Sequence, residues 1–576
     1  MTQPTPSPQT GKSPDCALTS HSINLHTGVV VQSLFRLKAL LSLELKRGGA
    51  WIGLLVIAHV ASWWLVALVA NAPLGIHNDM AEAFSWGREL QWGYYKHPPF
   101  WAWIARLWFS IFPTTTWAFY LLSAVNSAIG LLGVWAIAGR YVVGAPRLAA
   151  VLMLELVPFH HLYAFNYNAN SIQLSLWPWA IYLFIVSFER RTLVASAGFG
   201  VLAAAAMLSK YFGGVLLMGC FIAAVTNPRA SQYLRSPAPY LSMLAFGICM
   251  APHLAWSFEA VSGPVDYLAT KTHYPYRFIF LKAASFVVES VLLHCLLVTV
   301  LFGICWKLHC FEMRLSRIDV GSSLRDPKVR LVVMLATAPF ATTVLVSLIG
   351  HVRIGMKFAL PLFSLLPLMW IILYRVQFGL RSLRLLALAV GILIAGSALF
   401  AVPTAALKFK QNDRHFAEPR AIVAQRLTDL WHERIGTPLR IVAGTEGYAL
   451  ATTFYSADHP SDFTGFSTIK APWINDARLS RNGLAIVCAF SDGACLDQLG
   501  RFQALDSIRL TLNDVSDDFL GIAGTKSSFV VLLVKPGQTV LASTADCCVE
   551  ASRVRRSGRS PFLEDSRPSS AAGPPP

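Results

Sequence analysis

Long apolar segments alternate with short polar breaks from residue 50 to residue 403. A helix needs roughly 20 mostly apolar residues to cross a bilayer, and eleven segments come close to this length. The expected spans are residues 50–71, 117–139, 146–163, 171–188, 193–209, 211–227, 238–257, 280–305, 330–350, 356–374 and 383–403. The pattern therefore predicts a polytopic α-helical membrane protein with about 11 transmembrane helices.

Basic residues occupy every second break between these segments. Those before the first span are Arg36, Lys38, Lys46 and Arg47, and those after it include Arg140, Arg147, Arg190, Arg191, Arg229, Arg235, Arg314, Arg330, Arg375, Arg381 and Arg384. Loops rich in lysine and arginine stay in the cytoplasm. We therefore expect the alternate loops, and the tail after residue 404, to face the periplasm of a bacterial inner (plasma) membrane.

Composition supports a membrane protein. The 576 residues are 55% hydrophobic and 14% charged, and the mean hydropathy of +0.51 exceeds that of average soluble proteins. The formal net charge of +17 reflects arginines in the expected cytoplasmic loops, so no nucleic-acid partner is expected. Residues 1–49 lack the pattern of a cleavable signal peptide and predict a disordered cytoplasmic lead before a transmembrane domain at 50–403.

A soluble pattern replaces the apolar one in the tail. An amphipathic stretch at 420–436 is followed by the β-branched runs LRIVAG, LAIVCAF, SIRLTL and SFVVLLV. Interleaved helical and extended patterns predict a small periplasmic α/β domain at 404–548, followed by a disordered tail at 549–576. Cys488 and Cys495 flank a short polar turn and would form a disulfide if this domain is periplasmic.

Ionisable residues gather in the first outer loop, residues 72–116. Asp79 and Glu82 lie three residues apart and would share one face of a helix. Lys96 and His97 directly precede two prolines, which stiffen the turn. After them, FWAWIARLWFSIF has apolar residues at helical spacing and predicts an interfacial helix at 100–112.

Further basic and polar residues lie in the other outer loops. They are Lys210 with Tyr211, then Lys271, His273, Tyr274, Tyr276 and Arg277, then His351, Arg353 and Lys357, together with a polar loop of His160, His161, Asn166, Asn168 and Asn170. A snorkelling anchor explains any single cation but explains the whole set less well. Cations neutralise phosphate oxygens, and a carboxylate can serve as a general base. The set indicates group transfer from a lipid-linked phosphate.

The run DMAEAFSWGRELQWGYYKHPPFWAWI resembles the first outer loop of the lipid-carrier-dependent glycosyltransferases of the GT-C superfamily. The family 39 and aminoarabinose-transferase-like branch, which contains the protein O-mannosyltransferases, is the most similar. MLSKYFGG, which carries Lys210, resembles a later element of that family, and matching runs extend from about residue 50 to residue 370.

This resemblance implies roles for particular residues. Asp79 falls on the family's catalytic aspartate, and His97 and Lys210 fall where relatives contact the donor phosphate. Lys96 and Tyr211 flank these positions, and His273 and Arg277 resemble the basic residues of the family's mid-chain outer loop. Met80 replaces the family's second acid, so that Glu82 would have to supply any second catalytic carboxylate, and Asn170 stands where relatives often have aspartate.

The resemblance implies a glycosyltransferase that takes a sugar from a polyprenyl phosphate on the periplasmic face, with inversion at the anomeric carbon. The expected acceptor belongs to the cell envelope: lipid A or lipopolysaccharide, a glycan or a protein. No cofactor is required by this reading, and a divalent metal is left open. Two alternatives stand beside it: a flippase or exporter of lipid-linked sugars, and a non-catalytic membrane protein that binds envelope glycans.

Overall fold

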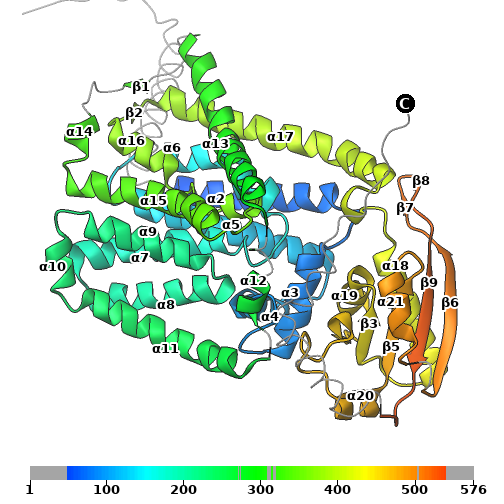
Figure 1. Cartoon of the computed structure of the whole chain (residues 1–576). Coiled ribbons are helices and arrows are strands. Elements are labelled where there is room, and N and C mark those ends of the chain that lie inside the picture. The colour runs from blue at the N-terminus through cyan, green and yellow to red at the C-terminus, as the bar shows by residue number, and fades with distance from the viewer. Residues whose placement is uncertain are drawn as a thin grey trace, which may run out of the picture.

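The computed structural model describes residues 49–261, 263–269, 272, 274–307, 313–314, 320–502 and 505–539. The expected lead at 1–48 and tail at 549–576, together with Lys271 and His273, lie outside the described residues. Two parts are visible in Figure 1: a bundle of helices and, at one end of it, a smaller α/β domain.

A helix overlaps each of the eleven predicted spans. The bundle consists of α2 (Gly49–Ala70), α5 (Thr116–Ala138), α6 (Ala145–Glu155), α7 (Gln173–Arg190), α8 (Leu193–Ser209), α9 (Gly213–Val225), α11 (Ala238–Glu259), α13 (Tyr276–Lys307), α15 (Pro327–Ile349), α16 (Leu366–Leu373) and α17 (Leu380–Gln411). Six described helices are long and apolar enough to cross a bilayer: α2, α5, α11, α13, α15 and α17. A polytopic membrane fold is confirmed, and the count of 11 spans stays a prediction.

The span predicted at 356–374 is interrupted. Residues Met356–Ala359 form a 3-10 turn, η3, and the helix α16 begins only at Leu366. Pro361 lies in the break, and proline removes a backbone donor that a continuous helix would use. This irregular backbone brings Lys357 to the outer end of the bundle.

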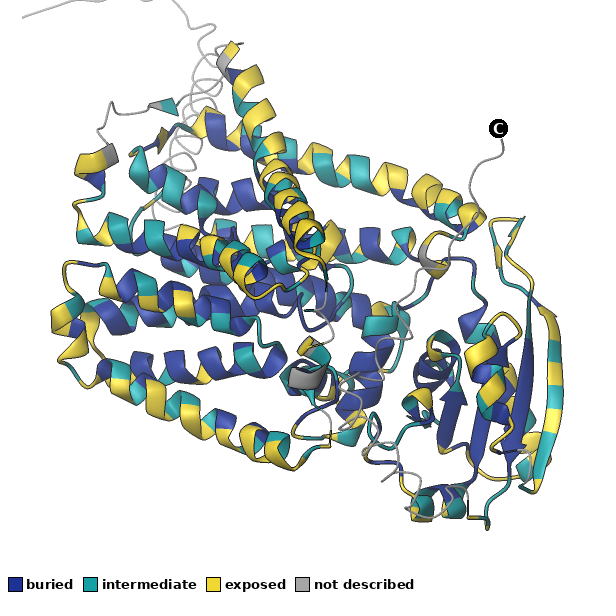
Figure 2. Ribbon diagram, viewed as in Figure 1, coloured by how far each residue is buried: buried dark blue, intermediate teal, exposed yellow. Residues whose placement is uncertain are grey.

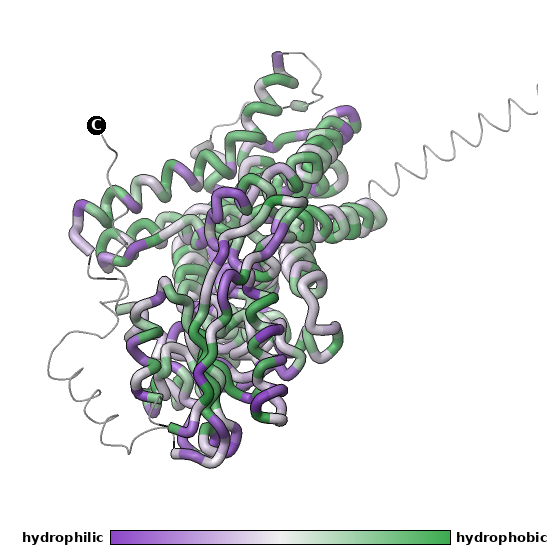
Figure 3. The backbone as a smooth tube through the Cα atoms, turned by 90° about the vertical axis from the view of Figure 1, so that its right-hand side faces the viewer, coloured by the Kyte–Doolittle hydropathy of each residue, from purple (hydrophilic) through white to green (hydrophobic). Residues whose placement is uncertain are grey.

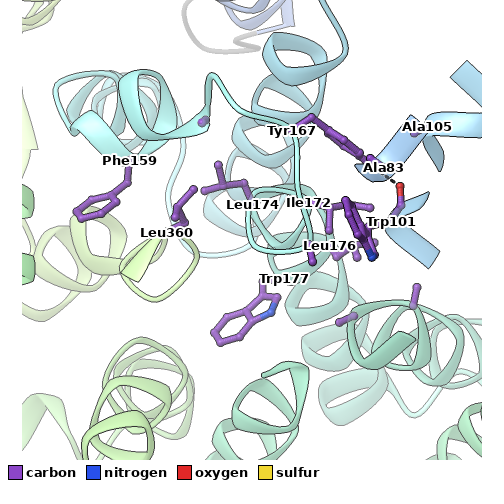
Figure 4. Packing of buried hydrophobic residues seen from close by; sticks show 14 of the residues in the cluster. Ala83, Trp101, Ala105, Phe159, Tyr167, Ile172, Leu174, Leu176, Trp177 and Leu360 are labelled. Carbon is purple, nitrogen blue, oxygen red and sulfur yellow. Dashed lines mark hydrogen bonds between the residues drawn. The ribbon is translucent and has the colours of Figure 1, made fainter. Parts of the chain in front are cut away.

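Close helix packing depends on small and aromatic residues. A Cβ atom added to Gly130 would lie 2.2 Å from the Leu174 carbonyl oxygen, and one on Gly200 would lie 2.3 Å from that of Ser242. Small residues at such crossings let membrane helices approach each other. In the core, the Tyr167 hydroxyl donates to the Trp101 carbonyl over 3.0 Å, as Figure 4 shows.

The bundle surface suits a lipid environment. Exposed residues cover much of α11 and α13 (Figure 2), and many are apolar, such as Leu244, Ile248 and Leu292. Apolar stretches follow the helices, whereas polar residues are frequent in the α/β domain, which faces the viewer in Figure 3.

Two helices of the first outer loop lie between the bundle and the α/β domain (Figure 1). They are α3 (Asn78–Glu89) and α4 (Phe100–Phe109), the latter within the predicted interfacial helix. They pack closely because a Cβ atom on Gly87 would lie only 2.4 Å from the Ala102 carbonyl oxygen. The short helix α10 (Ala230–Leu234), flanked by Arg229 and Arg235, lies at the opposite end of the bundle.

The α/β domain contains the predicted strands. The helices are α18 (Arg420–Ile435), α19 (Glu446–Tyr455), α20 (Asp476–Asn482) and α21 (Gly493–Leu499), and the strands are β3 (Ile441–Gly444), β4 (Ser461–Asp462), β5 (Leu484–Ala489), β6 (Ser507–Val515) and β9 (Ser527–Val534). The sheet order is β4-β3-β5-β9-β6. β3 is parallel to β4 and β5, and β9 is antiparallel to β5 and β6. The predicted disulfide between Cys488 and Cys495 is present.

Short elements complete the described chain. They are η1 (Pro158–His160), η2 (Leu162–Ala164), α12 (Pro264–Ala269), β1 (Met313–Arg314), α14 (Val320–Ser323), β2 (Gln377–Phe378), η4 (Asp413–His415), η5 (Thr464–Phe466), β7 (Asp518–Phe519) and β8 (Ile522–Ala523).

Candidate active site

A cavity of ≈ 560 Å³ opens where several segments that are distant in the sequence meet. It is lined by polar residues of the first outer loop, of the α7 and α8 ends and of the 352–358 segment: Asp79, Lys96, His97, Asn170, Lys210, Tyr211, Arg353 and Lys357. Apolar side chains, including Phe212, Val215, Ile354 and Phe358, line the rest. A charged patch therefore lies beside an apolar wall.

Asp79 lies in the first turn of α3, with its carboxylate toward the cavity. One carboxylate oxygen, Oδ2, accepts from Lys357 Nζ over 2.8 Å and from Asn168 Nδ2 over 3.1 Å. The Asn168 amide is oriented by its other end, because its Oδ1 accepts the backbone N–H groups of Asn170 and Ser171. Asp79 is thus held by one cation and one amide.

The charge state of Asp79 follows from these neighbours. Burial raises the pKa of this carboxyl group, but Lys357, His77 and Lys96 lower it by more, so that the pKa lies well below its ordinary value. Asp79 is therefore ionised at neutral pH. While it is paired with Lys357, it is a weak acceptor for a proton.

Glu82 lies one turn further along α3 and outside the cavity lining. Its two carboxylate oxygens accept from Lys96 Nζ over 3.1 and 3.3 Å. Burial raises the pKa of Glu82 to about 7, against the opposing effect of Lys96. Burial acts to lower the pKa of Lys96, but the attraction of Glu82, together with that of Tyr95, Asp79 and Glu446, outweighs burial, and the Lys96 pKa lies above its ordinary value. Lys96 is therefore a cation that lines the cavity and is held from behind by Glu82.

His97 lines the cavity next to Lys96. Its ring meets those of Trp101 and Tyr267 edge-on, with centroids 5.9 and 6.0 Å away. Burial, together with the positive charges of Lys210 and Lys96, lowers the pKa of His97 well below its ordinary value. His97 is thus neutral at physiological pH and can donate one hydrogen bond without adding charge.

Lys210 directly follows the last residue of α8, and it lines the same cavity. Nζ donates to Asn170 Oδ1 over 2.6 Å and lies 4.4 Å from the centre of the Phe358 ring. Burial lowers the pKa of Lys210 to about 7, despite the attraction of Asp79. An anionic ligand would favour its charged form.

Tyr211 and His253 connect the far wall to the first outer loop. The Tyr211 hydroxyl lies 2.8 Å from His253 Nε2, and His253 Nδ1 lies 2.7 Å from the Trp92 carbonyl oxygen. Since only a ring N–H can pair with that carbonyl, Nδ1 donates and Nε2 accepts from Tyr211. The Gly93 Cα also packs directly against Trp256.

The structure brings most of the predicted site residues together. Asp79, Lys96, His97, Lys210 and Tyr211 line one cavity. Arg277 is exposed in the first turn of α13 and does not line this cavity, and His273 lies outside the described residues.

Three further residues belong to the set of outer-loop polar groups that the sequence indicates, but none of them has an individual role among the predicted site residues. Lys357 and Asn168 hold Asp79 directly, and Arg353 lines the cavity. Lys357 is 278 residues from Asp79 along the chain, and no local spacing could indicate their contact. Only its place among the outward cations was a signal.

The part of the chain that the structure describes was compared with the side-chain arrangements that hold a protein-bound metal. Among the described residues, no group of three or more His, Cys, Asp or Glu side chains is arranged to hold a metal ion. Met80, in the position of the family's second acid, is fully buried.

Comparison with known proteins gives a family model that matches part of the chain and solved structures with a similar fold. Residues 96–256 match the family of dolichyl-phosphate-mannose-protein mannosyltransferases. The fold is similar to that of ArnT from Cupriavidus metallidurans bound to undecaprenyl phosphate, with a TM-score of 0.53 at 12% identity over 86% of this chain and 99% of ArnT. For apo ArnT the TM-score is 0.55 at 13% identity, over 84% and 98% of the two chains.

A second solved structure and the curated proteins give weaker similarity or none. The apo oligosaccharyltransferase of Archaeoglobus fulgidus gives a TM-score of 0.37 at 11% identity, over 76% of this chain and 70% of that one, and carries no argument. A search among curated proteins finds no match. The family match and the shared fold with ArnT together confirm the resemblance to the GT-C lipid-carrier-dependent glycosyltransferases that the first outer loop predicts.

Proposed function

We propose that this protein is a membrane glycosyltransferase that moves a sugar from a polyprenyl phosphate to a cell-envelope acceptor on the periplasmic face. The acceptor is lipid A or lipopolysaccharide, a glycan or a protein. One observation carries the proposal: Asp79 and the cations Lys96, Lys210, Arg353 and Lys357 line a single cavity that also has an apolar wall.

The charge of the cavity supports a phosphate ligand. Lys96 is paired with Glu82 and Lys357 with Asp79. Lys210 contacts an amide and an aromatic ring, and Arg353 lies 5.9 and 5.8 Å from the rings of Tyr274 and Phe278. The positive charges of Lys210 and Arg353 are therefore available to phosphate oxygens, which bind strongly to such cations.

The names of the similar proteins agree with this ligand class. One ArnT structure is bound to undecaprenyl phosphate, and the matching family is named for dolichyl phosphate mannose. At 12% identity the similarity to ArnT gives the fold alone. The support for a phosphate ligand therefore comes from the charged cavity of this chain.

The proposed reaction is a single displacement at the anomeric carbon of the sugar. Asp79 accepts the proton of an acceptor hydroxyl or amine as that atom bonds to the anomeric carbon. The bond from this carbon to the phosphate oxygen breaks, and its electron pair leaves with the polyprenyl phosphate. Lys210, Arg353 and Lys357 stabilise the departing charge, with His97 as a neutral donor. A single displacement inverts the anomeric configuration.

Asp79 must first lose its ion pair. Lys357 has a half-exposed side chain on the η3 turn, so it can reorient toward a bound phosphate without moving a helix. Once its ammonium contacts the phosphate, its lowering effect on the Asp79 pKa weakens, and the carboxylate becomes a better base. Donor binding and activation of the base are therefore coupled.

Three observations support a periplasmic site. Asp79 of the cavity lining lies on α3, and α3 and the α/β domain lie at the same end of the bundle, whereas the arginine-flanked α10 lies at the other (Figure 1). Positive loops favour the cytoplasm. The Cys488–Cys495 disulfide suits an oxidising compartment such as the periplasm.

A flippase would need a polar path across the bundle. Polar groups do lie between the helices: His59 Nδ1 and Glu155 Oε1 are 2.8 Å apart and both side chains are buried. The adjacent cavity, lined by His59, His160 and His161, measures only ≈ 10 Å³, which is about the size of one water molecule. It cannot pass a sugar, and this favours the transferase.

Transfer in detergent tests the proposal. Purified protein is mixed with a polyprenyl phosphate carrying a radiolabelled sugar and with extracted envelope lipid, glycan or protein. We expect label in the acceptor fraction, and a transfer rate at least about 100-fold lower with the Asp79→Asn protein. Because detergent leaves no two compartments, a flippase would give no transfer. Binding of envelope glycan without transfer would identify the non-catalytic alternative and overturn the proposal.

A further inference from the structure

Side chains of the α/β domain contact Gly75, Ile76 and Asn78, which lie shortly before Asp79 in the chain. The Tyr455 hydroxyl, at the end of α19, accepts the Ile76 backbone N–H over 2.9 Å. It packs so closely that a Cβ atom on Gly75 would lie 2.1 Å from it, and Gly75 has a φ of +69°. From the other side, the Tyr120 hydroxyl of α5 donates to the Gly75 carbonyl over 2.7 Å.

Among these contacts from the α/β domain, that of Arg420 is the nearest to Asp79 in the chain. Arg420, the first residue of α18, is 4% exposed. Its guanidinium donates to Glu418 Oε2 through Nε over 2.8 Å, and through Nη1 to Asn78 Oδ1 over 2.7 Å. Asn78 is the residue before Asp79. The ion pair with Glu418 therefore fixes the plane of the guanidinium, and an N–H group on Nη1 holds the Asn78 side chain.

The other end of α3 is held as well. Arg478 Nη1 contacts Glu89 Oε2 over 3.1 Å, and the Phe84 ring meets that of Phe454 edge-on, with centroids 5.2 Å apart. Since α3 carries Asp79 in its first turn, its placement relative to the bundle depends on the α/β domain as well as on α4.

We propose that Arg420 is a positioning residue, which holds the Asn78–Asp79 turn so that the carboxylate faces the cavity. The α/β domain is then part of the catalytic apparatus, although Arg420 itself does not line the cavity. This inference rests on the proposed function for its kinetic test. The cations that would bind the donor phosphate come from other segments, so losing Arg420 should leave donor binding intact while the base is misplaced.

The expected kinetic result is a split between kcat and KM. Misplacing a catalytic group by about 1 Å can cost on the order of 100-fold in rate. We expect Asn78→Ala and Arg420→Gln to lower kcat by about 10- to 100-fold, with the donor KM changed less than about 3-fold. Arg420→Lys should recover part of the rate. The double variant should be no slower than the worse single variant, because both changes break one contact.

Matched controls separate positioning from folding. Arg426→Ala changes an exposed arginine on the same helix and should keep the wild-type kcat. Asn78→Ala leaves the buried Arg420–Glu418 pair intact, so it tests the contact even if Arg420→Gln lowers the yield of folded protein. Wild-type kcat in a folded Asn78→Ala protein, or a loss that is fully additive in the double variant, would overturn the proposal.

Hydrogen exchange gives an activity-independent readout. Amide exchange of residues 75–80 should be faster in Arg420→Gln and Asn78→Ala than in the wild type or Arg426→Ala, with exchange in α5 unchanged. Unchanged exchange at 75–80 would overturn the proposed positioning role of Arg420. Inactive wild-type protein with the expected exchange pattern would instead overturn the proposed function and leave the positioning role supported.

Discussion

Asp79 and Glu82 are acids on the same helix, three residues apart, with opposite surroundings. Asp79 faces a cavity, and Lys357, His77 and Lys96 hold its pKa below the ordinary value against the effect of burial. Glu82 points away from the cavity, toward Lys96 and the α/β domain, and burial raises its pKa to about 7. One carboxylate can therefore meet a substrate, whereas the other orients a lysine that does.

The comparison teaches that spacing on a helix gives neighbours but not roles. The interval of three residues between Asp79 and Glu82 predicts that both acids share one face of the helix, and the sequence predicts catalytic roles for both. The contacts favour one base, Asp79, and one supporting acid, Glu82. This division can be tested by changing each partner separately.

The largest expected effect is on turnover. Asp79→Asn removes the proton acceptor, and general bases typically contribute about 10²- to 10⁴-fold. We expect kcat to fall by that factor, whereas Glu82→Gln should lower it by far less in the protein that folds. Single-turnover transfer of labelled sugar measures both. Equal losses in the two variants would mean that the acids act together.

The second effect is on stability. Glu82→Gln leaves the Lys96 ammonium without its partner, and breaking a buried ion pair typically costs about 3–5 kcal/mol. Thermal unfolding in detergent should show a lower Tm for Glu82→Gln, and Glu82→Gln combined with Lys96→Met should recover most of it. If the double variant is as unstable as the single one, the role of Glu82 is not to hold Lys96.

The third effect concerns donor binding. Lys210→Met removes a buried cation from the cavity, and a hydrogen bond to a charged group is worth about 1.5–3 kcal/mol, or roughly 10- to 100-fold in affinity. We expect the donor KM to rise by that factor. Lys328→Met, at the exposed start of α15, serves as the control and should keep the wild-type KM. A normal donor KM for Lys210→Met would place the phosphate elsewhere.

The smallest effect is on the pH profile. Burial lowers the pKa of Lys210 to about 7, so its cation is present below pH 7 and is lost as the pH rises through 7. The donor kcat/KM reports groups of the free enzyme and should fall several-fold between pH 6 and pH 8. In Lys210→Arg, which stays charged, this fall should be absent. If both proteins have the same pH profile, the fall in kcat/KM between pH 6 and pH 8 is caused by the titration of another group.

Much of the fold was predictable because local pattern determines it. The apolar lengths predict helices within all eleven spans, and the β-branched runs at 484–490 and 528–534 become β5 and β9. The 356–374 span is the exception. There the composition is apolar, but Pro361 and the turn η3 break the helix, and hydropathy does not register this.

The site was predictable only where a motif lay within one loop. Asp79, Lys96 and His97 belong to one short signature, and all three line the cavity. Lys357 and Arg420 reach the same region from 278 and 342 residues away. Tertiary folding creates such contacts, and a single sequence holds no periodicity that could reveal them.

The helix α17 has 32 residues, which at 1.5 Å per residue extends to about 48 Å, well beyond a hydrocarbon layer of about 30 Å. Its C-terminal turns, which include Pro403, connect the bundle to the α/β domain and form a stalk between them. Each residue inserted or deleted there would rotate the domain by about 100° about the stalk axis. The number of residues in this stalk therefore determines the orientation in which the α/β domain meets α3. A one-residue deletion far from the cavity should inactivate the protein, even though no residue of the active site is changed.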